Sequence, residues 1–366
     1  MRRFFFITLF SVAITVHPTL GFAKKTSKTA VSKAQGGTRK SAPQGPTYAQ
    51  REDVMRFADD LAERRGLDRE WVHQAIGQAR FIGSIPRLML PAPTGTAKNW
   101  RVYRSRFIDP IRIRAGVAFW QANRETLTRA EAEFGVPARI IVGIIGVETI
   151  YGQQMGNFRV IDALATLAFD FPAAHPRAVA RQEFFTGELE QFLSWSARTG
   201  ADPLDARGSY AGAMGMPQFM PSSIVKYAVD YDGDGRIDLW NSPADVIGSV
   251  ANYFKAFNWQ RGQPTHFPVR FEASRLDMDA LLAPDILPTF SQASFAAKGA
   301  VLEGDALQHA GPLALIELQN GEAAPSYVAG TENFYAITRY NWSSYYAMAV
   351  IELGDEVAAA LPAGPR

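Results

Sequence analysis

One ionisable residue stands at the end of a strongly apolar run. The stretch IIVGIIGVETIYG covers residues 140–152, and eight apolar residues and glycines precede Glu148 in it. On a helix, Ile140, Ile144 and Glu148 would fall on one face, so the acid would continue an apolar stripe. Two glycines, Gly152 and Gly156, follow and place Glu148 near the carboxyl end of that helix.

This position would suit acid catalysis. Removal from water disfavours the carboxylate anion, and so does the partial negative charge at a helix carboxyl end, so both raise the pKa of Glu148. A carboxylic acid that is neutral near pH 7 can protonate a leaving-group oxygen. The alternative is a helix that reaches the surface here, with Glu148 in water, and the pattern alone leaves both interpretations open.

A second group of carboxylates has the spacing of a cation site. The stretch DYDGDGRIDLW places three aspartates at positions 1, 3 and 5 of an EF-hand-like loop: Asp230, Asp232 and Asp234. Gly235 takes position 6, and the carbonyl of Arg236 is available at position 7. Position 12 is Asn241 rather than glutamate. A solvated turn is the alternative, but we predict a structural cation site, with calcium as the ion.

Composition excludes several other kinds of chemistry. The chain has 366 residues and no cysteine, which rules out disulfides, thiolate catalysis and cysteine zinc sites. Its formal charge of +2 argues against a nucleic-acid binder. The five histidines lack ligand-like spacing, so we expect no histidine-rich metal centre. They are His17, His73, His175, His266 and His309.

The N-terminus predicts export. Arg2 and Arg3 precede the apolar run from Phe4 to Val16, and small residues stand at Gly21 and Ala23. This is the layout of a secretory signal peptide cleaved after Ala23. A membrane anchor is the alternative, but the run is shorter than the roughly 20 residues needed to span a bilayer. We therefore expect a soluble protein outside the cytoplasm, without a stable membrane anchor after cleavage.

The elements that would position these groups are mostly helical. Helical periodicity dominates from Tyr48 to about Gly262 and includes a run over 116–134. From 265 to 340, short apolar stretches such as FPVRF, LALIEL and NFYAITRY alternate with turn residues, which predicts strands in a small sheet. The C-terminal stretch SSYYAMAVIELGDEVAAAL returns to helical spacing.

Two long motifs resemble a known family. IIVGIIGVETIYGQQMGNFRVIDALATLAFDFP and GSYAGAMGMPQFMPSSIVKYAVDYDGDGRIDLWNSPADVIGSVANYF are similar to the B-type membrane-bound lytic murein transglycosylases. The resemblance runs from about Tyr103 to the C-terminal helix. It implies a mainly α fold, in which a lysozyme-like helical core carries an N-terminal helical domain and a small β-domain.

The resemblance, together with the change from helical periodicity to short apolar stretches near residue 265, implies a domain plan. It comprises a signal peptide (1–23), a flexible linker (24–47), an N-terminal helical region (48–115), a lysozyme-like catalytic core with the EF-hand-like loop (116–264), a small β-rich domain (265–332) and a C-terminal segment that returns to the core (333–366).

The resemblance also implies an activity. The family are lyases that cleave the β-1,4 bond between N-acetylmuramic acid and N-acetylglucosamine in peptidoglycan glycan strands and leave 1,6-anhydromuramic ends. The C6 hydroxyl of the sugar replaces water as nucleophile, so one carboxyl, matched here by Glu148, acts first as acid and then as base. No cofactor is needed for that chemistry. A hydrolytic muramidase of the same fold and a non-catalytic peptidoglycan-binding protein are the alternatives.

Further site residues come from the matched motifs. Those matching sugar-contacting or groove positions are Tyr103, Ser209, Gln218, Tyr253, Tyr340, Asn341 and Tyr346. The chain carries Pro217 where many members have glycine. The family closes an expanded cation loop with a later aspartate, matched here by Asp245, although the match needs one residue more than the usual spacing. The implied metal set is therefore Asp230, Asp232, Asp234, Arg236 and Asp245.

Overall fold

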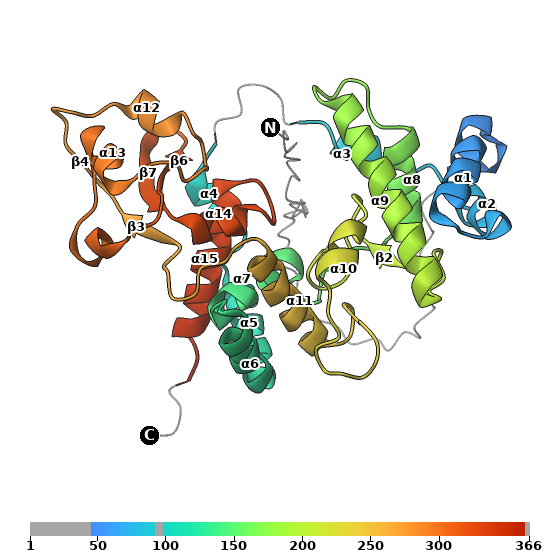
Figure 1. Ribbon diagram of the computed structural model, residues 1–366, viewed down its shortest axis with the longest axis horizontal. Helices are drawn as coiled ribbons and strands as arrows, with labels where there is room; N and C mark the ends of the chain where they lie inside the picture. The colour runs from blue at the N-terminus through green and yellow to red at the C-terminus, as the bar shows by residue number, and fades with distance from the viewer. Residues whose placement is uncertain (1–44, 92–97, 363–366) are drawn as a thin grey trace, which may run out of the picture.

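The computed structural model describes residues 45–91 and 98–362, and these are mainly helical, as predicted (Figure 1). The expected signal peptide and most of the expected linker lie outside the described residues. The helices are η1 (Tyr48–Gln50), α1 (Glu52–Arg65), α2 (Arg69–Gly77), α3 (Ile85–Leu88), α4 (Trp100–Arg104), α5 (Pro110–Ala122), α6 (Arg124–Phe134), α7 (Ala138–Thr149), α8 (Val160–Phe169), α9 (Ala178–Thr199), α10 (Pro221–Tyr227), α11 (Pro243–Ala256), α12 (Met278–Leu282), α13 (Gln292–Ala297), η2 (Gly304–Gln308), α14 (Glu332–Thr338) and α15 (Ser344–Ala359). The strands are β1 (Phe158–Arg159), β2 (Arg207–Gly208), β3 (His266–Pro268), β4 (Arg270–Phe271), β5 (Ala300–Val301), β6 (Ala314–Asn320) and β7 (Ala323–Gly330).

Helix α7 lies in the centre of the core and packs closely against α15. Residues 140–147 of α7 are all buried, as expected for a helix that is apolar on every side. Glycines allow the close approach. A Cβ on Gly143 would lie 2.2 Å from the Val350 carbonyl oxygen, and a Cβ on Gly354 would lie 2.0 Å from that of Arg139. The two backbones therefore touch where the helices cross.

The N-terminal helices are attached to α8 by polar contacts. The Tyr48 hydroxyl donates to Asp170 at 2.6 Å, and Arg51 donates to the same carboxylate at 2.9 Å. The backbone N–H of Arg80 donates to Asp162 at 2.9 Å. In Figure 1, α1 and α2 lie beside α8 and α9 at one end of the molecule, and the β-rich part lies at the other.

The helical run expected over 116–134 is divided in two. Asn123 leaves the helical conformation (φ −119°, ψ 23°), ends α5 and begins α6. Its side-chain amide donates to the Phe119 carbonyl at 2.8 Å, which satisfies an acceptor at the end of α5. The apolar periodicity continues across the break because both helices pack on the same core. The sequence pattern therefore gave no sign of the break at Asn123.

Strands β3, β7 and β6 form an antiparallel sheet in that order, and β4 pairs with β5. Leu315 faces Ala329 across the β6–β7 pair. These two residues belong to a second buried apolar cluster, separate from the main core, that also includes Phe295 and Leu313. The β-rich part therefore has its own small core.

One predicted strand was wrong. The stretch NFYAITRY was expected to extend, but residues 332–338 form helix α14. Thr331 caps this helix by accepting a hydrogen bond from the Asn333 N–H, and the acidic Glu332 lies in its first turn. The buried residues Phe334 and Ile337 are three apart, which is helical spacing that the aromatic composition obscured.

No helix in the described ranges has both the length and the apolar character needed to cross a bilayer.

Gly354→Ala tests the close helix contact. Because the new methyl group would meet the Arg139 carbonyl, we expect a loss of about 1–3 kcal/mol in the free energy of unfolding. Denaturant unfolding measures it. Gly187→Ala in α9 is the matched control, since a Cβ there meets nothing within 4 Å. That variant should gain about 0.5–1 kcal/mol. Equal stability of Gly354→Ala and the parent would contradict the contact.

Candidate active site

Glu148 lies one residue before the end of α7, on the wall of a cleft. The helix stops because Ile150 (φ 51°) and Tyr151 (φ 55°) both adopt the left-handed conformation, which non-glycine residues rarely take. The cleft is lined by residues from α7, the segments around 154–158 and 209–223, α11 and the segment after α14. Among the described residues lining it, Glu148 is the sole carboxylate.

The Glu148 carboxyl has one strong polar neighbour. The Tyr346 hydroxyl donates to Oε1 at 2.5 Å. Burial raises the pKa of Glu148 from 4.5 to about 7, and the hydrogen bond from Tyr346 opposes part of that rise. Burial and then the charge of Glu148 raise the pKa of Tyr346 well above 10, so this hydroxyl keeps its proton. The pair can therefore supply one exchangeable proton near neutral pH.

A glycine-rich turn opposite Glu148 presents Ser209 and Gln218. The Ser209 hydroxyl accepts from the Ala213 N–H at 3.0 Å and is almost fully buried. Gln218 has φ 51°, and its amide donates to the carbonyls of Met155 at 3.1 Å and Gly215 at 2.9 Å. These bonds use the amide hydrogens, which leaves the side-chain carbonyl of Gln218 to accept from a ligand.

Aromatic residues form the adjoining wall. The Tyr253 and Tyr340 ring centroids lie 4.8 Å apart, and Phe219 lies 5.8 Å from Tyr340. The Tyr340 hydroxyl donates to the Pro217 carbonyl at 2.5 Å, so proline, which lacks an N–H, still supplies the acceptor that fixes this ring. Such a wall suits the apolar face of a sugar.

The structure brings most of the predicted site residues together. Ser209, Gln218, Tyr253, Tyr340 and Asn341 line the cleft with Glu148. Two others do not line it. Tyr346 is fully buried beneath Glu148, and Tyr103 packs against Phe107 and Tyr345, with ring centroids 5.1 and 5.7 Å away.

Several cleft residues were missed by sequence reasoning. They include Phe107, Gln154, Phe158, Tyr210, Ser223 and Arg339. Arg339 directly precedes Tyr340, which could have identified it. Gln154, Phe158, Tyr210 and Ser223 lie within the two long motifs, which could have pointed to them. Phe107 lies outside both motifs, and only the fold places it here.

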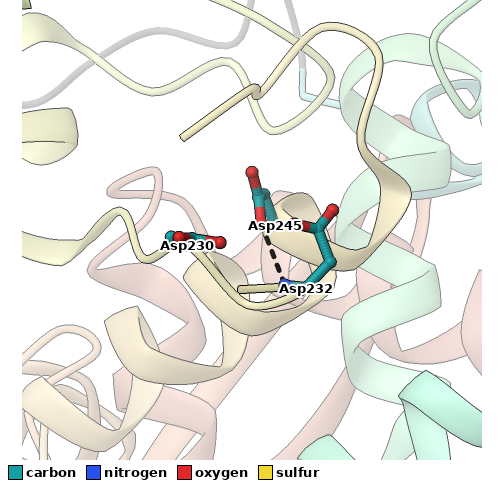
Figure 2. Close-up of side chains that lie close together, drawn as sticks. All are labelled: Asp230, Asp232 and Asp245. Carbon is teal, nitrogen blue, oxygen red and sulfur yellow. Dashed lines mark hydrogen bonds between the residues drawn. The ribbon is translucent and has the colours of Figure 1, made fainter. Parts of the chain in front are cut away.

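The acidic loop gathers three carboxylates (Figure 2). One oxygen from each of Asp230, Asp232 and Asp245 lies within 4.8 Å of the others. Asp245 accepts from the backbone N–H groups of Tyr231 at 2.7 Å and Asp238 at 2.8 Å. Burial, followed by the charge of Asp232, raises the pKa of Asp245.

The donor set fits a hard cation. Three carboxylate oxygens that converge repel one another, and Ca²⁺ or Mg²⁺ prefers oxygen ligands of this kind. Asp234, also predicted as a ligand, is oriented differently: its carboxylate accepts from the Arg236 N–H at 2.9 Å and its guanidinium at 3.2 Å. Arg236, at position 7 of the EF-hand-like loop, lies in the same turn as Asp234.

Known proteins share this architecture. The family model described as "Transglycosylase SLT domain" matches residues 49–355. The membrane-bound lytic murein transglycosylase B of Escherichia coli is 40% identical over 337 residues, covering 86% of this chain and 85% of that protein.

Two solved structures are informative. E. coli lytic transglycosylase Slt35 in complex with calcium is 42% identical, with a TM-score of 0.75. The match covers 86% of this chain and 96% of the Slt35 chain. Pseudomonas aeruginosa SltB3 in complex with NAG-anhNAM-pentapeptide is 31% identical, with a TM-score of 0.67. The match covers 83% of this chain and 79% of the SltB3 chain. The expected fold class, with a lysozyme-like helical core and small sheets, is confirmed by these likenesses. The chain belongs to the transglycosylase SLT family.

Proposed function

We propose that this protein is a peptidoglycan lytic transglycosylase, a lyase that cleaves the β-1,4 bond between N-acetylmuramic acid and N-acetylglucosamine. The main support is a cleft whose described lining holds one carboxyl group, Glu148, with a pKa raised to about 7. Family membership and the named activity of the E. coli relative support the same assignment.

In the first half of the reaction Glu148 acts as the acid. Protonated, it gives its proton to the glycosidic oxygen while the bond from that oxygen to the anomeric carbon breaks. Burial of the carboxyl, in a cleft that Val147 and Phe219 also line, favours the neutral form before this step. The Tyr346 hydroxyl then stabilises the carboxylate that results, since a hydrogen bond to the anion is stronger than one to the neutral acid.

In the second half the same carboxylate acts as the base. It takes the proton of the C6 hydroxyl on the muramic acid while the C6 oxygen bonds to the anomeric carbon and closes the 1,6-anhydro ring. Ordinary glycosidases use two carboxylates, one on each side of the bond. A substrate that carries its own nucleophile needs only one protein carboxylate, and the described lining of the cleft holds one, Glu148.

Polar residues opposite Glu148 would hold the substrate. The Gln218 carbonyl can accept from a sugar hydroxyl or acetamido N–H, and Ser209 and Asn341 provide further polar groups. Tyr253 and Tyr340 offer aromatic surface to a pyranose ring. We assign these five residues to substrate binding.

The acidic loop is proposed to bind calcium through Asp230, Asp232 and Asp245. A cation there would neutralise three converging charges and stabilise the loop without taking part in the reaction. We also propose that the chain is exported to the periplasm, where peptidoglycan is found, through the apolar N-terminal segment.

Glu148→Gln should remove activity while leaving glycan binding intact, because the amide can neither donate a proton to the leaving oxygen nor take one from the C6 hydroxyl. We expect a fall in kcat of at least about 100-fold. Digestion of purified peptidoglycan, with the products weighed by mass spectrometry, measures it. Anhydro ends from the parent support the transglycosylase, reducing ends would identify a muramidase, and an active Glu148→Gln would point to a non-catalytic role for this residue.

Activity and stability should both depend on the proton of Glu148. Since the acid step needs the protonated form, kcat/KM should fall about tenfold per pH unit above pH 7. The folded pKa lies above the unfolded value, so the stability contributed by Glu148 is complete below pH 4.5 and is lost as pH rises through 7. Glu148→Gln should therefore be more stable than the parent at pH 8, by about 3 kcal/mol, and not at pH 4. A difference that is constant with pH would contradict the raised pKa.

Calcium should stabilise the fold through the acidic loop. At a calcium concentration 100 times the Kd, linkage predicts a gain of about 2.7 kcal/mol, measured as a higher thermal midpoint that EGTA reverses. Asp245→Asn should abolish the calcium effect. Asp205→Asn, an exposed acid outside the loop, should retain it. Calcium insensitivity of the parent would exclude the proposed site.

A further inference from the structure

The backbone of Met216 is held from both sides. The Thr149 hydroxyl donates to the Met216 carbonyl at 2.8 Å, and the Met216 N–H donates to the Leu239 carbonyl at 2.8 Å. Thr149 is the residue directly after Glu148, and Leu239 belongs to the acidic loop. Met216 thus joins the catalytic helix to the proposed cation site through its two adjacent peptide groups.

The backbone after Thr149 is arranged around its hydroxyl. Thr149 is fully buried, and its Oγ1 also accepts from the Gly152 N–H at 3.0 Å. Between them, Ile150 and Tyr151 both take left-handed conformations. Such strain persists only where the surroundings impose it. The Thr149 hydroxyl, bonded on both sides, is one of the contacts that fix this turn.

The peptide group between Gly215 and Met216 is also bonded to Gln218. The Gln218 side chain donates to the Gly215 carbonyl at 2.9 Å, and Gln218 itself is left-handed, with φ 51°. Met214 and Phe219 close the turn through reciprocal backbone hydrogen bonds of 2.8 and 3.1 Å. A shift of the Met216 peptide would therefore carry Gln218 with it.

On its other side, Met216 is bonded to the loop that gathers the carboxylates. Leu239 follows Asp238, whose N–H donates to Asp245 at 2.8 Å. Asp245 is one of the three proposed cation ligands. Two hydrogen bonds and one covalent step therefore separate the Met216 peptide from a ligand of the ion.

We propose that Thr149 is a positioning residue for the reaction. Through the backbone of Met216 it holds the turn that brings Gln218 into the same cleft as Glu148, and it extends this support to the cation loop. The inference rests on the proposed function, because it concerns the geometry in which Glu148 meets the bound glycan.

Thr149→Val tests this role, since it removes the hydroxyl and keeps the shape. We expect kcat to fall roughly 10- to 100-fold with KM within a few-fold, because a small misplacement of Gln218 relative to Glu148 affects the transition state more than substrate binding. Thr149→Ser keeps the hydroxyl and should restore kcat to within a few-fold of the parent.

Thr166→Val is the matched structural control. Thr166 is likewise fully buried, its hydroxyl accepts from the Ile82 N–H at 3.0 Å, and neither residue lines the cleft. It should lower the thermal midpoint by an amount similar to that of Thr149→Val while leaving kcat unchanged. If Thr149→Val retains the parent kcat, or if Thr166→Val loses as much, the positioning role is wrong. An inactive parent would instead refute the proposed function.

Amide hydrogen exchange in the parent tests the link without any substitution. Calcium should slow exchange of the Met216 N–H about tenfold relative to EGTA, because ordering the loop strengthens its bond to Leu239. In Thr149→Ser the same effect should persist, whereas in Thr149→Val basal exchange should be faster. If calcium raises the thermal midpoint of the parent but leaves the exchange rate of the Met216 N–H unchanged, the coupling is refuted.

Discussion

The close crossing of α7 and α15 is the constraint on which the candidate site depends. The helices run antiparallel, and their backbones meet at Gly143 opposite Val350 and at Gly354 opposite Arg139. Continuing this register toward the carboxyl end of α7 brings Glu148 opposite Tyr346, where the 2.5 Å hydrogen bond forms. A larger residue at either glycine would separate the helices and with them the acid and its partner.

The electrostatics of the cleft follow from that packing. α7 is apolar on all sides because it lies in the core, and the same burial raises the pKa of Glu148 near its end. The Tyr346 hydroxyl moderates the rise without supplying a charge. A cation beside Glu148 would favour the carboxylate and lower its pKa, so a neutral donor suits a group that must both release and accept a proton.

Two sequence interpretations failed, and for related reasons. The periodicity over 116–134 continued across a real break at Asn123, because two helices can bury the same face on one core. The aromatic stretch at 333–340 was assigned to a strand, although Thr331 caps a helix there. In both cases tertiary packing decided the outcome between local alternatives of similar free energy.

By itself the sequence determined the mainly helical class, the place of one acid near the end of an apolar helix, and the acidic loop. These depend on local periodicity and spacing, which a chain carries along its length. The tertiary structure alone decided that Tyr346 donates to Glu148, that Thr149 reaches Met216, and that Asp234 turns to Arg236 instead of joining the other aspartates of the loop. Such contacts depend on ångström-scale register between separate segments, which is set when the helices pack against one another.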